Sequence, residues 1–358
     1  MKSSPFVWAT SVVAITLITL TPSDRQTYAQ DGVDADYRFN NRNPAYNSGT
    51  GPQVCIDEAH FEYHTVDGGF KPFAQLLRDD GYRVNGFSTD FTREALKDCQ
   101  ILVIANASAE VNAVNEKILN WSYPHPSAFA GEEITELILW VQGGGSLFLI
   151  VDHAPWPGAA ANLAVLLGVH MLDGDAYSSG EALERTGMVV FGRALKEGWR
   201  EKARLNKTPF DYYRPILSNL GTLAPHPILI GRGLKERVDS VVTYGGHAFY
   251  TSENWEPLLV FGPNAVCQIP VEYNLEDSER QSGPLFSVAR WSQGAARKLG
   301  KGRIVVLGEA GMCTAQIEDN VPWGINAPEA LHNAQFCLNV VHWLSGLLDG
   351  TQPMPRDR

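Results

Sequence analysis

The sequence predicts a doubly wound α/β fold with a mostly parallel sheet. Short, continuous apolar runs alternate along the chain with segments whose apolar residues have helical spacing. Strands that are apolar throughout are typical of a parallel sheet buried on both faces, and a strand–helix–strand order implies right-handed crossovers. The apolar runs are Val54–Ile56, Ile101–Ala105, Leu147–Val151 and Ile304–Leu307.

Three amphipathic segments supply the predicted helices. The first covers Pro72–Asp80, and Gly81 ends it. The second has apolar residues at i, i+3, i+4 and i+7 over 134–141, and the run Gly143–Gly145 ends it. The third is the C-terminal segment Phe336–Leu347.

The strands and helices place one α/β domain at residues 53–350. Residues 173–302 interrupt the alternation with Gly, Pro and short apolar runs, so we expect a β-rich insertion or extension there. Residues 30–52, rich in Asn, Asp and Gly, are expected to be a flexible lead-in, and 351–358 a tail. No internal repeat is visible.

The N-terminal residues 1–29 have the order of a secretory signal peptide. Lys2 precedes the apolar run Phe6–Leu20, and the segment Thr27–Ala29 suits a signal peptidase. We therefore expect a secreted or periplasmic protein with no stable membrane span after cleavage. An uncleaved membrane anchor is the alternative.

The composition limits the classes of partner. The chain has 358 residues, of which 44% are hydrophobic, and a formal net charge of −11. Such a chain is neither disordered nor collagen-like, and its acidity argues against a nucleic-acid partner, which requires a basic surface. A small molecule or a carbohydrate is the expected ligand.

The five cysteines leave at least one thiol unpaired. Cys55 lies in an apolar strand and Cys337 on an apolar helix face, where a free thiol behaves as a small hydrophobe. We expect buried free thiols, with disulfides as the alternative that export permits.

Polar residues follow each predicted strand. In open α/β sheets, ligands bind beyond the carboxyl ends of the strands, so these residues are expected to line one crevice. Carboxylates crowded there require a cation or a shared proton, although capping of neighbouring helices is the alternative for Asp152 and Glu309. The expected metal ligands are Asp57, His60, Asp152 and His153, the candidate general bases are Glu58 and Glu309, and the candidate ligand-binding residues are Asn106, Trp156 and Trp323.

Three familiar motifs are excluded. The segment Asp57–His60 spells a helicase box, but the phosphate-binding loop that a helicase requires is missing. His60–His64 has the wrong spacing for a zinc protease, since Glu62 does not directly follow the first His. In an extended segment His60, Glu62 and His64 would share one face, and surface or capping histidines are the alternative. No Ser or Cys elbow follows Leu147–Val151, which disfavours acyl transfer.

In the predicted strands and the polar residues that follow them, the chain resembles uncharacterised secreted members of the class I glutamine amidotransferase-like superfamily. These proteins are related to trehalose-utilisation-type and gliding-transporter auxiliary domains. The resemblance implies a flavodoxin-like fold over about Gln53–Leu348. Asp152 and His153 stand where the Cys elbow of the amidotransferases would be, so glutamine hydrolysis is not expected. The matching stretches are Ile56–His60, Leu102–Asn106, Gly144–Leu147 with Asp152-His153, Gly302–Ala310 and the helix Asn333–Leu344.

Taken together, the sequence predicts an exported amidotransferase-like domain that binds a small molecule or a carbohydrate in a polar crevice. The alternative is a metal-assisted hydrolase, in which the expected Asp and His ligands hold a divalent metal and Glu309 or Glu58 acts as the general base toward a bound water molecule.

Overall fold

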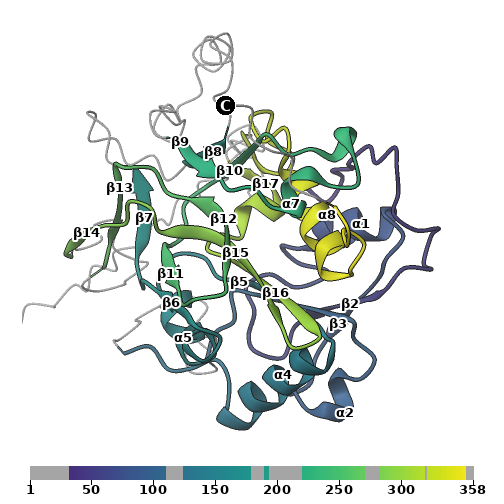
Figure 1. Cartoon of the computed structure of the whole chain (residues 1–358), viewed down its shortest axis with the longest axis horizontal. Helices are drawn as coiled ribbons and strands as arrows, with labels where there is room; N and C mark the ends of the chain where they lie inside the picture. The colour runs from purple at the N-terminus through teal and green to yellow at the C-terminus, as the bar shows by residue number, and fades with distance from the viewer. Residues whose placement is uncertain are drawn as a thin grey trace, which may run out of the picture.

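The centre of the molecule is a sheet of five parallel strands. Their spatial order is β3 (Arg83–Phe87), β2 (Gln53–Asp57), β4 (Ile101–Ala105), β5 (Ser146–Ile150) and β16 (Gly302–Leu307) (Figure 1). All four predicted apolar runs form strands of this sheet, and their bounds differ from the prediction by at most two residues. The computed structural model describes residues 32–109, 124–178, 189–192, 220–270, 283–318 and 321–351.

Beyond β16 the sheet becomes mostly antiparallel, so the fold is α/β with a mixed sheet. β15 (Ser292–Leu299) pairs antiparallel with β16, and β12 (Glu256–Val260) pairs antiparallel with β15. β9, β8 and β10 continue this half, while β11 and β6 pair at its side. The bounds are Leu220–Leu223 for β9, Val189–Gly192 for β8, Ser240–Thr243 for β10, Phe249–Thr251 for β11 and Val169–Met171 for β6.

Two small sheets and several short helices complete the described part of the chain. One small sheet contains β1, β17 and β18, and the other contains β14, β13 and β7. Their bounds are Gly32–Val33, Ala315–Glu318, Val321–Gly324, Leu285–Ser287, Ala265–Gln268 and Asp175–Ser178, and the short helices are α2 (Arg93–Leu96), α7 (Pro227–Ile230), η2 (Leu234–Glu236) and η3 (Gly311–Cys313).

Helices cover both faces of the parallel strands because successive strand side chains point to opposite faces. Ile56 and Ile150 pack with α1 (Lys71–Asp79) and α8 (Asn333–Leu344), forming the first core. Cys55 and Leu149 lie in the second core with α4 (Gly131–Gly143) and α5 (Trp156–Leu166). The three predicted helices correspond to α1, α4 and α8.

The segment expected to be a flexible lead-in lies against the domain. β1 pairs with β17, and Tyr37, Phe39 and Tyr46 pack against the first core. The side chain of Asn41 and the backbone N–H of Ala45 both donate to Asp80 Oδ1, at 2.7 and 2.9 Å. Part of the polar composition of this segment therefore reflects hydrogen bonds to the domain.

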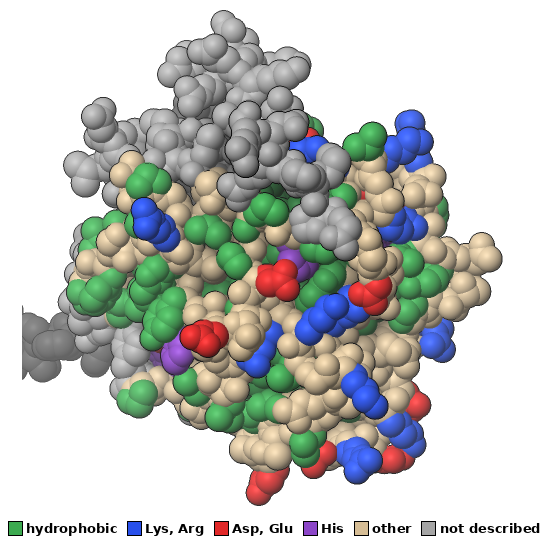
Figure 2. All heavy atoms as spheres, viewed as in Figure 1, with side chains coloured by type: hydrophobic (Ala, Val, Ile, Leu, Met, Phe, Trp, Pro, Cys, Tyr) green, Lys and Arg blue, Asp and Glu red, His purple; other side chains and the backbone are tan. Residues whose placement is uncertain are grey.

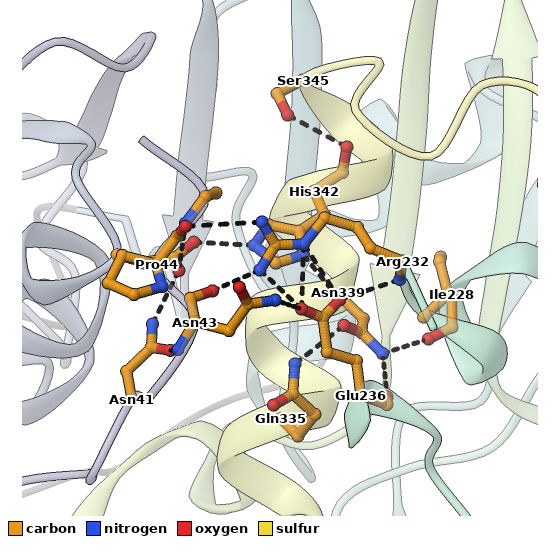
Figure 3. Close-up of polar contacts among 12 residues, drawn as sticks. Asn41, Asn43, Pro44, Ile228, Arg232, Glu236, Gln335, Asn339, His342 and Ser345 are labelled. Carbon is orange, nitrogen blue, oxygen red and sulfur yellow. Dashed lines mark hydrogen bonds and ion pairs between the residues drawn. The ribbon is translucent and has the colours of Figure 1, made fainter. Parts of the chain in front are cut away.

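Asp80 belongs to a buried polar network around α8. Figure 3 shows Arg232, Glu236, Asn339 and His342 of this network. His342 Nε2 lies 2.7 Å from Asp80 Oδ2, and both side chains are fully buried. Asn339 donates to the carbonyl oxygens of Ile228 and Glu236, at 2.7 and 2.8 Å. We call the set Asp80, Arg232, Glu236, Asn339 and His342 the α8 network.

Glu236 connects this network to the N-terminal segment. Its carboxylate accepts hydrogen bonds from the Arg232 side chain and from Asn43 Nδ2, the latter at 3.1 Å. Burial alone would raise the pKa of Glu236, but the Arg232 hydrogen bonds and charge lower it overall. Glu236 and Arg232 thus form a charged pair inside the domain.

The cysteine prediction was wrong at two positions. Cys55 bonds to Cys99 and Cys337 bonds to Cys313, with Cα–Cα distances of 5.9 and 6.1 Å, whereas Cys267 is a buried free thiol. An apolar environment suits a disulfide as well as a thiol, so local sequence does not distinguish them.

The surface carries both signs of charge. Figure 2 shows acidic and basic side chains interspersed around α2 and α4, and hydrophobic side chains gathered over β13 and β14. None of the described helices combines the length and apolarity that a membrane crossing requires. The predicted signal peptide lies outside the described residues.

Candidate functional site

The strand register brings several predicted polar residues to one edge of the sheet. Ala105 pairs with Ile150, which pairs with Leu307, so these three strands end at the same level. Asn106, Asp152 and Glu309 follow directly beyond that level, as parallel strands require. Asp57 is the last residue of the adjacent strand β2.

Side-chain alternation divides these residues between the two faces. Asp57 follows Ile56 of the first core and so points towards the second, where the ring of its partner His60 packs against Phe91 and Phe129 at 4.3 and 5.0 Å. Glu309 lies on the opposite face, where its carboxylate accepts the N–H of Met312 at 2.8 Å. The edge therefore carries two separate polar groups.

The first group comprises Asp57, His60 and Glu62, and we call it the loop group. Potential ligand atoms of the three side chains lie within 4.8 Å of one another. His60 Nδ1 is 2.7 Å from Asp57 Oδ2 and 3.9 Å from Glu62 Oε1. Asp152 and His153, predicted to share a metal with Asp57 and His60, do not belong to this group.

The acidity of the loop group is strongly altered. Burial, the largest cause, raises the pKa of Asp57 to about 7. Burial together with the hydrogen-bonding contact to Asp57 raises the pKa of Glu62 to about 10. Two carboxyl groups this close cannot both be ionised without a compensating positive charge.

The second group comprises Asn106, Asp152, His247 and Glu309, and we call it the strand-end cluster. Asn106 Oδ1 accepts the backbone N–H of Asp152 at 2.8 Å, and the Asp152 carboxylate lies 3.4 Å from the N–H of Ala310. Burial and then the negative charge of Asp152 raise the pKa of Glu309 well above its usual value. The Glu309 carboxyl is therefore a much weaker acid than an exposed glutamate.

His247 completes this cluster and has a defined tautomer. Its Nδ1 lies 3.1 Å from the carbonyl oxygens of both Val151 and Asp152. Nδ1 therefore carries the hydrogen, and Nε2 presents a lone pair. Burial lowers the pKa of His247 to about 4, so the ring is neutral at pH 7.

Several buried polar atoms at this edge have no hydrogen-bond partner among the described residues. They belong to the loops after β2 and β4 and to the segment between β10 and β11, and they are Glu62 Oε1, His64 Nδ1, Asn106 Nδ2, Ser108 Oγ and His247 Nε2. Each buried atom of this kind costs about 1–3 kcal/mol when it stays unpaired. This concentration marks the edge as a place where a ligand or water completes the hydrogen bonding.

Aromatic rings lie beside these loops. Trp156, at the start of α5, packs against Tyr63 with ring centroids 5.7 Å apart and against His153 at 5.1 Å. Tyr63 is 69% exposed. His153 Nδ1 is 2.7 Å from the carbonyl oxygen of Ala154. Trp156 therefore contacts His153, and with Tyr63 the two rings form an aromatic surface.

Glu58, a candidate general base, and Trp323, a candidate ligand-binding residue, contact residues outside the loop group and the strand-end cluster. The Glu58 carboxylate accepts the backbone N–H of Val66 at 2.8 Å and so fastens the loop after β2. Trp323 lies in β18 and packs against Tyr244 with ring centroids 4.7 Å apart.

Sequence reasoning did not identify Glu133 and His247 as site residues. It noted that Glu62 could share one face with His60 and His64 but did not include it among the site residues. Glu133 Oε1 reaches His60 Nε2 at 2.8 Å from helix α4, 73 positions away, and no local pattern announces this contact. His247 enters from the antiparallel half.

No family model and no curated protein matches the chain, whereas solved structures resemble its fold. The mmIFT52 N-terminal domain is 12% identical with a TM-score of 0.52, over 84% of this chain and 100% of that one. Cytoplasmic protein STM3548 from Salmonella typhimurium is 13% identical (TM-score 0.42, 82% and 98% covered). A ThuA-like protein from Bacteroides uniformis is 13% identical (TM-score 0.40, 84% and 95% covered). At these identities the likeness concerns the fold alone.

Proposed function

We propose that this chain is an exported, amidotransferase-like domain with a flavodoxin-like core, and that it binds a small hydroxyl-bearing molecule, such as a carbohydrate, at the strand-end cluster. The observation that carries this proposal is the pair of unpartnered buried atoms, Asn106 Nδ2 and His247 Nε2. The spatial order of the five parallel strands supports the flavodoxin-like core.

The chemistry of these two atoms selects the ligand class. Asn106 Nδ2 is a donor, and His247 Nε2 is an acceptor because its other nitrogen carries the hydrogen. A hydroxyl group satisfies both needs, since its oxygen accepts from Asn106 and its hydrogen is donated to His247. Tyr63 and Trp156 supply apolar ring faces of the kind that pack against sugars.

Calorimetric titration with a panel of neutral monosaccharides, disaccharides and polyols tests the proposal. Asn106→Asp keeps the oxygen that Asp152 N–H requires and tolerates the positive φ of 59°, but it replaces the donor by an acceptor. We expect at least tenfold weaker binding. Absence of binding across the panel would overturn the carbohydrate assignment.

A matched tyrosine pair tests the aromatic surface. Tyr63→Ala is expected to weaken sugar binding, whereas Tyr250→Ala, which removes an exposed tyrosine packed on His170 at 4.6 Å, is expected to leave it unchanged. Export is tested separately by N-terminal sequencing, which should find a mature chain that begins near Gln30.

A metal-assisted hydrolase is the second candidate function. The observation that favours it is the loop group, whose one imidazole and two carboxylates are suitable metal ligands. Cation binding alone would not establish hydrolysis, which requires a substrate turned over by the metal-loaded protein.

A further inference from the structure

The loop group contains one buried oxygen, Glu62 Oε1, that has no hydrogen-bond partner in the described part of the protein. Asp57 Oδ1 accepts the N–H of Ala59 at 3.2 Å, and Glu62 Oε2 accepts the N–H of His60 at 3.1 Å. Each carboxylate is thus fastened by one oxygen to the backbone of the same loop. The second oxygens, Asp57 Oδ2 and Glu62 Oε1, both face His60 Nδ1.

The far side of the imidazole is held by Glu133. His60 Nε2 lies 2.8 Å from Glu133 Oε1, and the Glu133 carboxylate also accepts the backbone N–H groups of Phe91 and Ala130 at 3.0 and 2.9 Å. A neutral ring that donates Nε2–H to this carboxylate has a lone pair on Nδ1, whereas a ring with hydrogen on Nδ1 donates to Asp57 Oδ2 at 2.7 Å. Ion binding selects the first form. A histidine oriented by a carboxylate in this way is the usual form of a metal-ligating histidine.

Three lone-pair atoms therefore converge, and Glu62 Oε1 has no hydrogen-bond partner among the described residues although the Glu62 side chain is fully buried. A positive species must lie between acceptors so close together. We propose that Asp57, His60 and Glu62 bind one first-row divalent ion of the Zn²⁺ or Mn²⁺ type, with Glu133 as a positioning residue.

The donor set defines the kind of ion. One imidazole and two carboxylates without thiolate suit Zn²⁺ and Mn²⁺. Ca²⁺ requires six to eight oxygen ligands, and Mg²⁺ prefers oxygen ligands with several waters, so both should bind more weakly here. The site lies on the opposite face of the sheet from Glu309.

The test titrates Zn²⁺, Mn²⁺, Mg²⁺ and Ca²⁺ individually into the full chain after chelator treatment and dialysis. Calorimetry should show one Zn²⁺ or Mn²⁺ per chain and weaker binding of Mg²⁺ and Ca²⁺. Glu62→Gln should weaken Zn²⁺ binding at least tenfold. Glu329→Gln, a change of the same kind at a buried carboxyl outside both the loop group and the strand-end cluster, should bind Zn²⁺ as the unchanged protein does.

Glu133→Gln distinguishes metal positioning from a structural role. It keeps an acceptor oxygen for the backbone but weakens the orientation of His60, so we expect Zn²⁺ binding about 10–100-fold weaker with unchanged circular dichroism. If Glu62→Gln fails to fold, Asp57→Asn takes its place. The proposal is overturned if the unchanged protein binds no ion at 1:1 stoichiometry, which would assign a proton to this position, or if Glu62→Gln, or Asp57→Asn in its place, binds Zn²⁺ equally well.

Discussion

Two buried polar regions of this molecule contain similar residues and differ in how completely their atoms are hydrogen-bonded. In the α8 network, Asp80 accepts three hydrogen bonds and Asn339 uses its nitrogen twice. In the strand-end cluster, Asn106 and His247 each have a side-chain nitrogen without a partner among the described residues.

The difference separates stabilising groups from binding groups. A buried polar network contributes to stability when its members are satisfied, and it is costly when they are not. The α8 network joins the N-terminal segment, α7 and α8, and only His342 Nδ1 within it lacks a partner, lying 3.9 Å from Glu236. The strand-end cluster retains unpaired groups, as expected of a site that a ligand completes.

Asp80→Ala is expected to have the largest effect on stability. It removes the acceptor of Asn41, Ala45 and His342 inside the protein. Breaking a buried pair of this kind costs about 3–5 kcal/mol, which urea unfolding would measure. Asp79→Ala removes an exposed neighbour and should cost less than about 0.5 kcal/mol. Equal effects of the two variants would contradict the assigned role of the α8 network.

The pH dependence of stability gives the next largest effect. Burial holds the pKa of His64, His226 and His247 at about 4, so their contribution, full above pH 6.5, is lost as the pH falls towards 4. The raised pKa values of Glu62 and Glu309 change stability with pH in the opposite direction. Their contribution is full below pH 4.5 and is lost as the pH rises through the folded pKa.

Between about pH 4.5 and 6.5, the histidines make the free energy of unfolding rise with pH and the carboxyl groups make it fall. Above pH 7 only the effect of the carboxyl groups remains. Stability of the metal-free protein should then fall by about 1.4 kcal/mol per pH unit for each neutral carboxyl. Glu62→Gln should reduce this slope by one such step, because the pKa of Glu62 is raised to about 10. Urea unfolding at pH 7, 8 and 9 with chelator measures it, and an unchanged slope would show that Glu62 is ionised in the folded protein.

The central sheet was predictable from sequence because its strands are buried on both faces. Ile101–Ala105 is apolar throughout, and its bounds agree with β4. Since parallel strands end at one edge, the meeting of Asn106, Asp152 and Glu309 could also be predicted. Within residues 173–302, the described part of the chain contains the strands from β7 to β15.

The alternation of side chains along each strand also predicts which of these polar residues share a face of the sheet. Asp57 follows Ile56, and Asp152 follows Val151, and these two residues belong to different cores. Counting the alternation along each strand would have separated Asp57 from Asp152 and so divided the predicted metal set.

Contacts distant in sequence could not be predicted. The Cys313–Cys337 disulfide and the contact of Glu133 with His60 depend on the packing of helices against the sheet. The N-terminal segment has the composition of a loop, but its asparagines bind Asp80 and Glu236, which are buried in the domain. Composition cannot reveal such partners.

Glu58 provides a smaller test, which separates a structural carboxylate from a general base. Glu58→Ala removes the acceptor of the Val66 N–H and should cost about 1–2 kcal/mol of unfolding free energy. Glu58→Gln keeps an acceptor oxygen and should cost less than half of that. Equal losses in urea unfolding would show that the charge, and not the hydrogen bond, is what stabilises the loop after β2.

Ser108→Ala is expected to change the free energy of unfolding least, and in the opposite direction to Ser146→Ala. Its buried Oγ has no partner among the described residues, whereas the buried Ser146 Oγ donates to the carbonyl oxygen of Leu344 at 2.8 Å. Ser108→Ala removes an unpaired polar group, so the free energy of unfolding should stay constant or rise by up to about 1 kcal/mol. Ser146→Ala removes a satisfied hydrogen bond and should lower it by about 1 kcal/mol. Both substitutions delete one oxygen atom, so opposite signs in parallel urea titrations isolate the effect of hydrogen bonding. If Ser108→Ala destabilises the ligand-free protein as much as Ser146→Ala does, Ser108 Oγ is hydrogen-bonded without a ligand, and the edge of the sheet is less open to binding than its unpaired atoms indicate.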